Sequence, residues 1–247
     1  MGENGCGKTT FAKLMNGLII PTLGDVFVEN INTKNPDNYK KIPKIVSMTF
    51  QNPDEQIIAS CVEDEIAFNL ENMCFPGEKM SIKISKLLKF VELEGYEKRT
   101  TESLSGGQKQ KLMLACALST EPKVIILDEI TSMIDSIARR NIMKILSKIN
   151  QILKIAIIMI THDTYEATFA QKIILMKNGE IKIIDKPENI LSNLEIIKNF
   201  NITPLKSTIL LKNIINNGYN VRLENSLDNK FCAKEIISIL ESNNVKC

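Results

Sequence analysis

The stretch Met1-Gly-Glu-Asn-Gly-Cys-Gly-Lys-Thr-Thr10 opens the chain and decides its fold class. Residues 2–9 match G-x-x-x-x-G-K-[ST], a loop pattern that binds phosphate groups. Its glycines let backbone N–H groups curl around an anion, because they accept positive φ and carry no side chain. A helix expected from about Thr9 through Leu14 points its positive end at the same anion. Lys8 is then placed to reach the β- and γ-phosphates, and the Thr9 hydroxyl to bind Mg²⁺.

Length and charge bound the class of protein. With 247 residues the chain has room for one large domain, or for one domain and a small appendage. A net charge of +2 argues against a nucleic-acid binder. The longest apolar runs, such as Val124–Leu127 and Ile155–Ile160, are too short to cross a bilayer, and no signal peptide precedes the loop. We expect a soluble or peripheral protein, so any membrane role needs a partner with membrane spans.

Cysteine and histidine usage excludes a zinc site of the usual spacing. The chain has one histidine, and none of its six cysteines forms a C-x-x-C pair. Scattered cysteines of this kind suggest reduced thiols in a cytoplasm. They stand at positions 6, 61, 74, 116, 232 and 247.

Polar residues follow three predicted buried strands. Gln51 follows Lys44–Phe50, and His162 follows Ile155–Ile160. The unbroken apolar run within Lys123–Glu129 is typical of a central parallel strand covered on both faces. Ligands bind at the carboxyl edge of such sheets, so these polar groups should converge near the phosphate loop.

The two acids that end the Lys123–Glu129 run have separate predicted roles. Asp128 is placed to hold Mg²⁺, directly or through water. Glu129, one residue further on, lies where a base would orient and deprotonate an attacking water. A pair of acids that merely ends a strand is the alternative interpretation.

A second helix start is also built to face an anion. In Leu104-Ser-Gly-Gly-Gln-Lys-Gln110, Ser105 is placed to cap the helix that continues through Lys111–Leu118. The two glycines remove side chains from the positive end of that helix.

The remaining pattern predicts further helices, a hairpin and a distinct tail. Beyond Pro187 the composition shifts to Asn, Ile, Leu and Lys without any motif, which indicates an appended helical segment for self-association or packing. The elements expected are a short strand within 24–28, a polar loop over Asn30–Tyr39, helices over Val62–Leu70, Ile82–Leu93, about 136–153, Ser207–Asn216 and Ala233–Leu240, and a hairpin that turns at Asn178–Gly179.

In this order, the motifs resemble those of an ATP-binding cassette (ABC) ATPase, a member of the P-loop NTPases. The resemblance covers nearly all of residues 1–187. It matches Gly2–Thr10 to the Walker A loop, Lys123–Glu129 to the Walker B strand, Leu104–Gln108 to the signature L-S-G-G-Q, Gln51 to the Q-loop, Ser132–Asp135 to the D-loop and His162 to the switch histidine.

The resemblance implies that two cassettes sandwich two ATP molecules, with Mg²⁺ as the second cofactor. The Walker A loop of one subunit then faces the signature loop of the other. The implied ATP-binding residues are Gly2, Glu3, Asn4, Gly5, Cys6, Gly7, Lys8, Thr9, Thr10, Ser105, Gly106, Gly107, Gln108 and Asp135. The implied catalytic residues are Glu129, His162 and Gln51, and the implied Mg²⁺ ligands are Thr9, Gln51 and Asp128.

The resemblance also implies an α/β architecture with a mostly parallel central sheet. The expected domains are an ABC ATPase domain over 1–187, with a helical subdomain over about 60–118, and a helical dimerisation-type segment over 188–247. The family's N-terminal antiparallel sheet and the strand before Walker A are largely missing, because Gly2 directly follows Met1. We therefore expect the phosphate loop to lack its anchoring strand and to fray.

Finer features resemble the energy-coupling factor (ECF) ATPases, relatives of the cobalt and nickel importer ATPases. They are Gln51-Asn-Pro-Asp-Glu-Gln56, the stretch Val62–Asn72 and Thr131-Ser-Met-Ile-Asp135. This resemblance implies ATP-driven uptake of a vitamin or a transition-metal micronutrient, at the cytoplasmic face of the cell membrane. The implied partners are a second ATPase subunit, in a homo- or heterodimer, a transmembrane coupling subunit and a substrate-binding membrane subunit, with no nucleic acid.

We considered three other interpretations, of which one remains. A DNA-repair ABC ATPase would carry a long coiled coil between Lys8 and Leu104, and a translation-type ABC protein would carry two cassettes; the sequence shows neither. The third reading is an inactive, truncated cassette with a structural role in a heterodimer.

Overall fold

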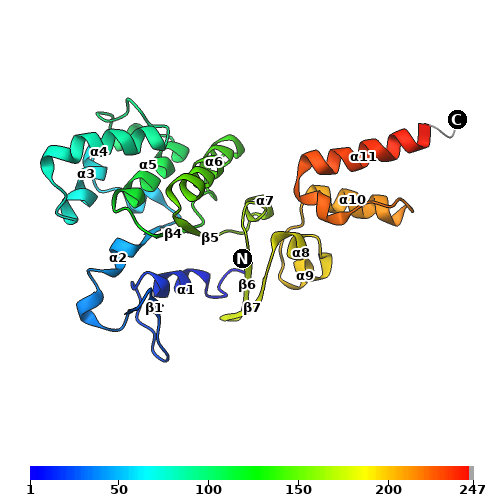
Figure 1. Cartoon of the computed structure of the whole chain (residues 1–247), viewed down its shortest axis with the longest axis horizontal. Helices are drawn as coiled ribbons and strands as arrows, with labels where there is room; N and C mark the ends of the chain where they lie inside the picture. Colours follow the sequence, from blue (N-terminus) through cyan, green and yellow to red (C-terminus); the bar gives the residue numbers. More distant parts are fainter. Residues whose placement is uncertain (245–247) are drawn as a thin grey trace. The chain divides into compact units, whose positions relative to one another are not determined.

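The computed structural model describes the backbone of residues 1–244, and all their side chains except those of residues 224, 225, 229 and 242–244. Two compact units emerge, which we call the sheet unit (Thr9–Ile160) and the hairpin unit (Met1–Lys8 with Thr161–Cys247). Figure 1 labels most of their helices and strands. The predicted boundary at residue 187 stays a prediction.

The sheet unit alternates helices and strands. Helix α1 starts at Lys8, one residue before the predicted start. The elements are α1 (Lys8–Met15), β1 (Phe27–Val28), β2 (Ile31–Asn32), the 3-10 turn η1 (Pro36–Asn38), α2 (Ile42–Ile45), β3 (Val46–Thr49), η2 (Pro53–Glu55), α3 (Val62–Asn72), α4 (Gly77–Phe90), η3 (Thr101–Ser103), α5 (Gly106–Ser119), β4 (Val124–Asp128), α6 (Ser136–Leu153) and β5 (Ala156–Ile160).

Strand β4 is the centre of the parallel sheet in this unit. It pairs with β3 from Val46↔Val124 to Thr49↔Leu127, and with β5 from Val124↔Ala156 onward to the end of β4. Ile125, Ile126 and Leu127 are fully buried. The predicted central parallel strand is confirmed.

Both faces of the sheet are covered, which explains the unbroken apolar run. Ile125 and Leu127 point into a core with α3, α4, α5 and α6, because successive side chains of a strand alternate between its faces. Ile126 points into a second core with Ala12 of α1 and with Ile42 of α2. Helices α3, α4 and α5 lie side by side over the first core (Figure 1).

The hairpin unit is built on an antiparallel pair. Strands β6 and β7 turn at Asn178 and Gly179, whose φ angles are 53° and 79°. This is the predicted hairpin, with both turn residues in the left-handed region. The elements are α7 (Thr164–Ala167), β6 (Ile173–Lys177), β7 (Glu180–Asp185), α8 (Pro187–Leu191), α9 (Leu194–Asn199), α10 (Lys206–Asn216), η4 (Leu223–Leu227) and α11 (Asn229–Asn244).

Main-chain pairing with β6 holds the first residues of the chain. The carbonyl oxygen of Met1 accepts the N–H of Met176 at 2.9 Å, and Gly2 forms a parallel bridge with Met176. The Met1 side chain packs on the core formed by β6, α8 and α9. The expected fraying of the phosphate loop is therefore wrong at Gly2, because a neighbouring strand supplies the main-chain partner.

Several element boundaries differ from those predicted. The region Asn30–Tyr39 was expected to be a polar loop, but β2 pairs with β1 and η1 follows it. Residues 44 and 45 belong to α2 and not to the strand, and α4 begins at Gly77, five residues before the predicted start. Helices α8 and α9 lie in the segment expected to be helical, but their bounds were not predicted, since each is too short for helical periodicity to show.

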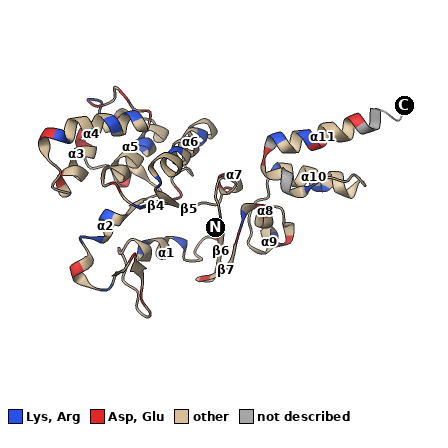
Figure 2. Cartoon of the chain, viewed as in Figure 1, with Lys and Arg blue, Asp and Glu red and all other residues tan. Residues whose placement is uncertain are grey.

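Charged residues, cysteines and apolar helices are distributed as follows in the described part of the chain. Basic and acidic residues both lie along the described part of α11 (Figure 2). Cysteines 6, 61, 74, 116 and 232 are free thiols, and Cys247 lies outside the described residues. Within residues 1–244, no helix has the length and apolar character needed to cross a membrane.

Glu92 joins two helices of the sheet unit and gives a pH-dependent prediction. Its carboxylate accepts hydrogen bonds from Nζ of Lys111 in α5 at 3.0 Å and from Nζ of Lys148 in α6 at 3.1 Å. The pKa of Glu92 is lowered from 4.5, chiefly by the hydrogen bond from Lys111. A depressed folded-state pKa stabilises the fold above the unfolded pKa and loses that contribution as pH falls through the folded value.

We expect Glu92→Gln to lower the free energy of unfolding by less than about 1 kcal/mol near neutral pH, because these side chains are partly exposed. The difference from wild type should shrink as pH falls below 4.5. Thermal unfolding across that range measures it, with Glu94→Gln, at an exposed ion pair, as control. A difference that is constant with pH contradicts the assignment.

Candidate nucleotide site

The phosphate loop is folded as an anion-binding loop. Gly2, Gly5 and Gly7 have φ angles of 148°, 76° and 96°, which disfavour any residue with a side chain. A Cβ on Gly2 would lie 2.2 Å from the carbonyl oxygen of Met176, so only glycine fits there. The N–H of Cys6 donates to the Glu3 carbonyl at 3.3 Å, which closes the turn.

Lys8 is buried and folds back on its own loop. Its amino group donates to the carbonyls of Gly2 at 3.0 Å and Glu3 at 2.9 Å. These contacts hold an ammonium group inside the curl of the loop, where it can exchange carbonyl partners for phosphate oxygens. Asn4 and Gly5 are exposed. The Glu3 carboxylate accepts a hydrogen bond from Nδ2 of Asn201 at 2.9 Å.

Thr9 and Asp128 meet in the sheet unit, although 119 positions separate them. The Thr9 hydroxyl donates to Asp128 Oδ2 at 2.7 Å. Thr10, the next residue of α1, is exposed, and Asp128 is 6% exposed at the end of β4. One hydroxyl and one carboxylate are hard oxygen ligands, which fit Mg²⁺ when nucleotide phosphates and water complete its shell.

The described residues contain no cluster of three or more His, Cys, Asp or Glu that could hold a metal alone. A magnesium ion carried by a nucleotide needs only one or two protein carboxylates, so the Thr9–Asp128 pair suits that ion better than a dedicated metal site.

Ser132 links the two predicted residues Gln51 and Glu129. Gln51 Nε2 donates to the Ser132 hydroxyl at 3.3 Å, and that hydroxyl donates to the Glu129 carbonyl at 2.8 Å. Glu129 has φ 50°, a left-handed conformation that costs a non-glycine residue about 1–2 kcal/mol. Its N–H donates to the Ile160 carbonyl at 3.0 Å, so hydrogen bonds fix both sides of the strained residue.

The signature segment forms a capping box at the start of α5. The N–H of Gln108 donates to Ser105 Oγ at 3.4 Å, and the N–H of Ser105 donates to Gln108 Oε1 at 2.8 Å. This confirms Ser105 as the cap. Gly107 also packs against α6, because a Cβ there would lie 2.8 Å from the Cβ of Ala138. A Cβ on Gly106 would have its nearest contact at 3.6 Å, with Cγ2 of Ile134.

Asp135 caps α6. Its carboxylate accepts the N–H of Ile137 at 2.8 Å and of Ala138 at 2.9 Å. The bond from Ala138, followed by that from Ile137, lowers the pKa of Asp135 and keeps it ionised. Its predicted contact with ATP stays a prediction, since this capping role alone explains an acid at that position.

His162 is exposed in the hairpin unit, on a backbone that its neighbours fix. The hydroxyl of Thr161 donates to the buried carboxylate of Glu166 and accepts the N–H of Asp163 at 2.9 Å. Asp163 in turn caps α7 by accepting the N–H of Tyr165 at 2.7 Å. The segment that presents the histidine is therefore rigid on both sides.

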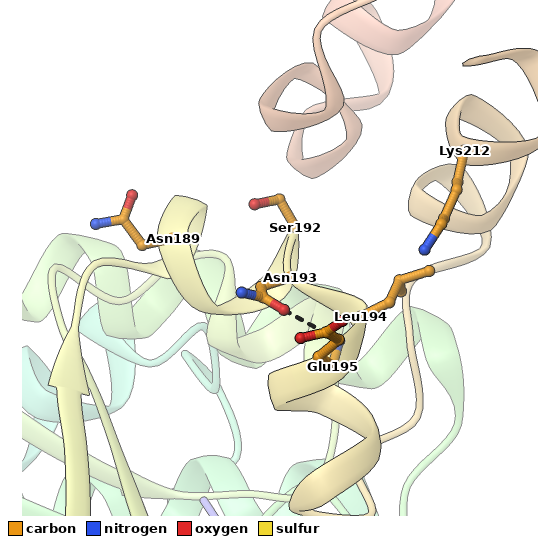
Figure 3. A pocket seen from close by; sticks show the side chains of 6 residues that line it. All are labelled: Asn189, Ser192, Asn193, Leu194, Glu195 and Lys212. Carbon is orange, nitrogen blue, oxygen red and sulfur yellow. Dashed lines mark hydrogen bonds between the residues drawn. The ribbon is translucent and has the colours of Figure 1, made fainter. Parts of the chain in front are cut away.

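A hollow of about 500 Å³ lies elsewhere in the hairpin unit, beside α8, α9 and α10. Figure 3 shows its polar lining, with Lys212 directed in from α10. Local bonds use the nearby polar groups: Asn193 accepts the N–H groups of Glu195 and Ile196, and Ser192 donates to the Glu188 carbonyl. No predicted site residue lines this hollow.

Sequence reasoning overlooked some residues that act through others. Ser132 and Glu166 touch predicted residues or the segments that carry them, but neither was among the proposed site residues. A hydroxyl residue three positions after the strand-ending glutamate was the available signal for Ser132. Glu166 gave no signal, because a buried acid in a short helix has no sequence pattern of its own.

The close contact of Gly107 gives a stability prediction. We expect Gly107→Ala to lower the free energy of unfolding by about 1–3 kcal/mol, since the new methyl overlaps Ala138. The double variant Gly107→Ala with Ala138→Gly should regain part of the lost free energy of unfolding. Chemical denaturation measures both, with Gly106→Ala as the control that has room for a methyl. Equal stability of Gly107→Ala and wild type contradicts the contact.

Comparison with known sequences agrees with this geometry. The ABC transporter family matches residues 1–132. The energy-coupling factor transporter ATP-binding protein EcfA1 of Clostridium novyi is 35% identical over 247 residues, which is 100% of this chain and 84% of that protein. EcfA1 of Mycoplasma mobile is 39% identical over 198 residues, covering 80% of this chain and 72% of that protein.

Solved structures agree as well. The structure of cbiO1 from Clostridium perfringens, described as part of the ABC transporter complex cbiONQ, has a TM-score of 0.74 at 29% identity, covering 86% of this chain and 85% of its own. A dimeric ATP-binding cassette in a post-hydrolysis state with ADP and Pi has a TM-score of 0.67 at 30% identity, covering 76% and 83%. The chain belongs to the ABC transporter ATP-binding family, and its relatives there are the ATP-binding proteins of energy-coupling factor transporters.

Proposed function

We propose that this chain is the subunit that binds and hydrolyses ATP to energise an ECF-type uptake transporter. The observation that carries the proposal is the Thr9–Asp128 contact at 2.7 Å, because it places the hydroxyl that follows Lys8 in the sequence at the end of the central strand. A loop that bound phosphate for structural reasons alone would not need a carboxylate at that hydroxyl.

Binding rests on residues 2–10, with the loop N–H groups and Lys8 around the phosphates. Thr9, Asp128 and Gln51 are the proposed ligands of Mg²⁺. The ion would neutralise charge on the β- and γ-phosphates. Glu129 acts as the general base that orients and deprotonates water. His162 and Gln51 position groups around the γ-phosphate.

A second cassette completes the proposed assembly. Ser105, Gly106, Gly107 and Gln108 face the partner's nucleotide with the positive end of α5, and Asp135 borders that interface. Residues 188–247 support the dimer. The solved post-hydrolysis cassette is dimeric, which supports this arrangement for its relatives.

Location and cargo follow from the relatives in the same way. We infer a peripheral protein at the cytoplasmic face of the cell membrane, bound to a transmembrane coupling subunit and a substrate-binding membrane subunit. The cargo is a vitamin or a transition-metal micronutrient. The likeness to cbiO1, part of a cbiONQ complex, favours a cobalt or nickel importer ATPase as the second candidate.

An inactive cassette with a structural role is the rival function. Both functions predict a folded chain, but they differ in turnover. We expect Glu129→Gln to lower ATP hydrolysis by at least about 100-fold, because it removes the proposed base, and to leave ATP affinity within a few-fold of wild type.

Phosphate release and equilibrium binding measure the two effects, with Glu94→Gln, an exposed acid outside the site, as the matched control. Hydrolysis by wild type that survives in Glu129→Gln shows that another group is the base. Wild type that binds ATP without turnover supports the structural role.

A further inference from the structure

Gln110 of α5 makes a contact that the proposed chemistry does not use. Its side chain is 1% exposed, and its Nε2 donates to the main-chain carbonyl of Gln51 at 3.2 Å. The opposite amide orientation would place two oxygens face to face, so the contact fixes which atom is the donor. The end of β3 is thereby tied to the signature helix.

The other end of the same amide indicates more than packing. Gln110 Oε1 is buried without a hydrogen-bond partner among the described residues. Buried acceptors without partners are rare and destabilising. An apolar side chain of similar length would avoid this cost, so stability alone does not account for glutamine at this position.

An ion pair makes a second link one residue away. Lys109 of α5 pairs with Asp54 of η2, and the Lys109 side chain is 17% exposed. Asn52 caps η2 by accepting the N–H of Asp54 at 3.1 Å, and Gln56 Oε1 accepts the N–H of Phe50 at 2.8 Å. Residues 50–56 therefore form one braced segment, which we call the Gln51 loop.

Both links attach within the first turns of α5, directly after Gly106–Gln108. A helix is stiff over such a length, because each N–H bonds the carbonyl four residues before it. A displacement of the Gln51 loop is therefore passed to the start of α5 as a rigid-body movement.

We propose that Gln110 and the Lys109–Asp54 pair are positioning residues that clamp the Gln51 loop to the signature helix. Contact between Gln51 and the chain's own nucleotide then moves Ser105–Gln108, the segment that faces the partner's nucleotide. The inference rests on the proposed function for its nucleotide step, whereas the clamp itself rests on the Gln110 and Lys109 contacts.

The test is hydrogen exchange of the backbone amides at 50–56 and 105–109, in the full chain carrying Glu129→Gln. Without nucleotide, Gln110→Met should speed exchange in the Gln51 loop by about tenfold, the change expected for one lost hydrogen bond. The melting temperature should be unchanged or raised, because the buried acceptor is removed together with the donor.

Charge reversal gives an independent arm. Lys109→Asp and Asp54→Lys should each speed exchange at 50–56, and the double reversal should restore it. The matched control is the neighbouring pair Lys111–Glu92 on the same helix, where Lys111→Glu should leave exchange at 50–56 unchanged. If Gln110→Met does not fold, the charge-reversal variants alone test whether the clamp exists.

With MgATP, exchange at 105–109 should slow in the parent chain and fail to slow in Gln110→Met, at equal ATP affinity. In a chain with Glu129 intact, Gln110→Met should lower kcat and leave KM for ATP unchanged. If Gln110 had a purely structural role, Gln110→Met would change the melting temperature and would leave both kcat and KM for ATP unchanged.

Unchanged exchange at 50–56 in both Gln110→Met and the single reversals overturns the clamp. Slowing at 105–109 that persists in Gln110→Met overturns the transmission step. An absence of any ATP effect at residues 2–10, with the nucleotide-free effects present, contradicts the proposed function and supports the clamp.

Discussion

The parallel pairing of β4 with its two neighbours is the constraint on which the site depends. Because β3, β4 and β5 run in one direction, their carboxyl ends meet at one edge, where the strands end at Thr49, Asp128 and Ile160. Burial of Ile125, Ile126 and Leu127 fixes that register energetically. A slip by one residue would reverse every side chain and take Asp128 away from Thr9.

Hydrogen bonds to main-chain atoms hold the site more than bonds between the reactive groups do. Ser132 donates to the Glu129 carbonyl, and Gln110 donates to the Gln51 carbonyl. Such contacts fix the main-chain positions from which the Glu129 and Gln51 side chains start. The left-handed Glu129 follows the same logic, since strain at one residue persists only where its neighbours hold both sides.

The sequence predicted what periodicity and motifs encode. The unbroken run at 124–127 predicted a strand covered on both faces, and Ser105 predicted the start of α5. It did not predict β2 or the early start of α4, because a two-residue pairing and a polar first turn carry no hydrophobic period. The contacts of Ser132, a residue of the predicted D-loop, and of Gln110 were not predicted for another reason: they join residues 81 and 59 positions apart in sequence, which local patterns do not show.

The most direct test of the account is calorimetric titration of ATP into the purified chain, with and without Mg²⁺. We expect one nucleotide per chain at micromolar affinity with Mg²⁺, because the proposed site holds one triphosphate. Weaker binding without Mg²⁺ should accompany it, since Thr9 and Asp128 then lose their shared ion. Absence of ATP binding at millimolar concentration, in a chain that unfolds cooperatively, would contradict it.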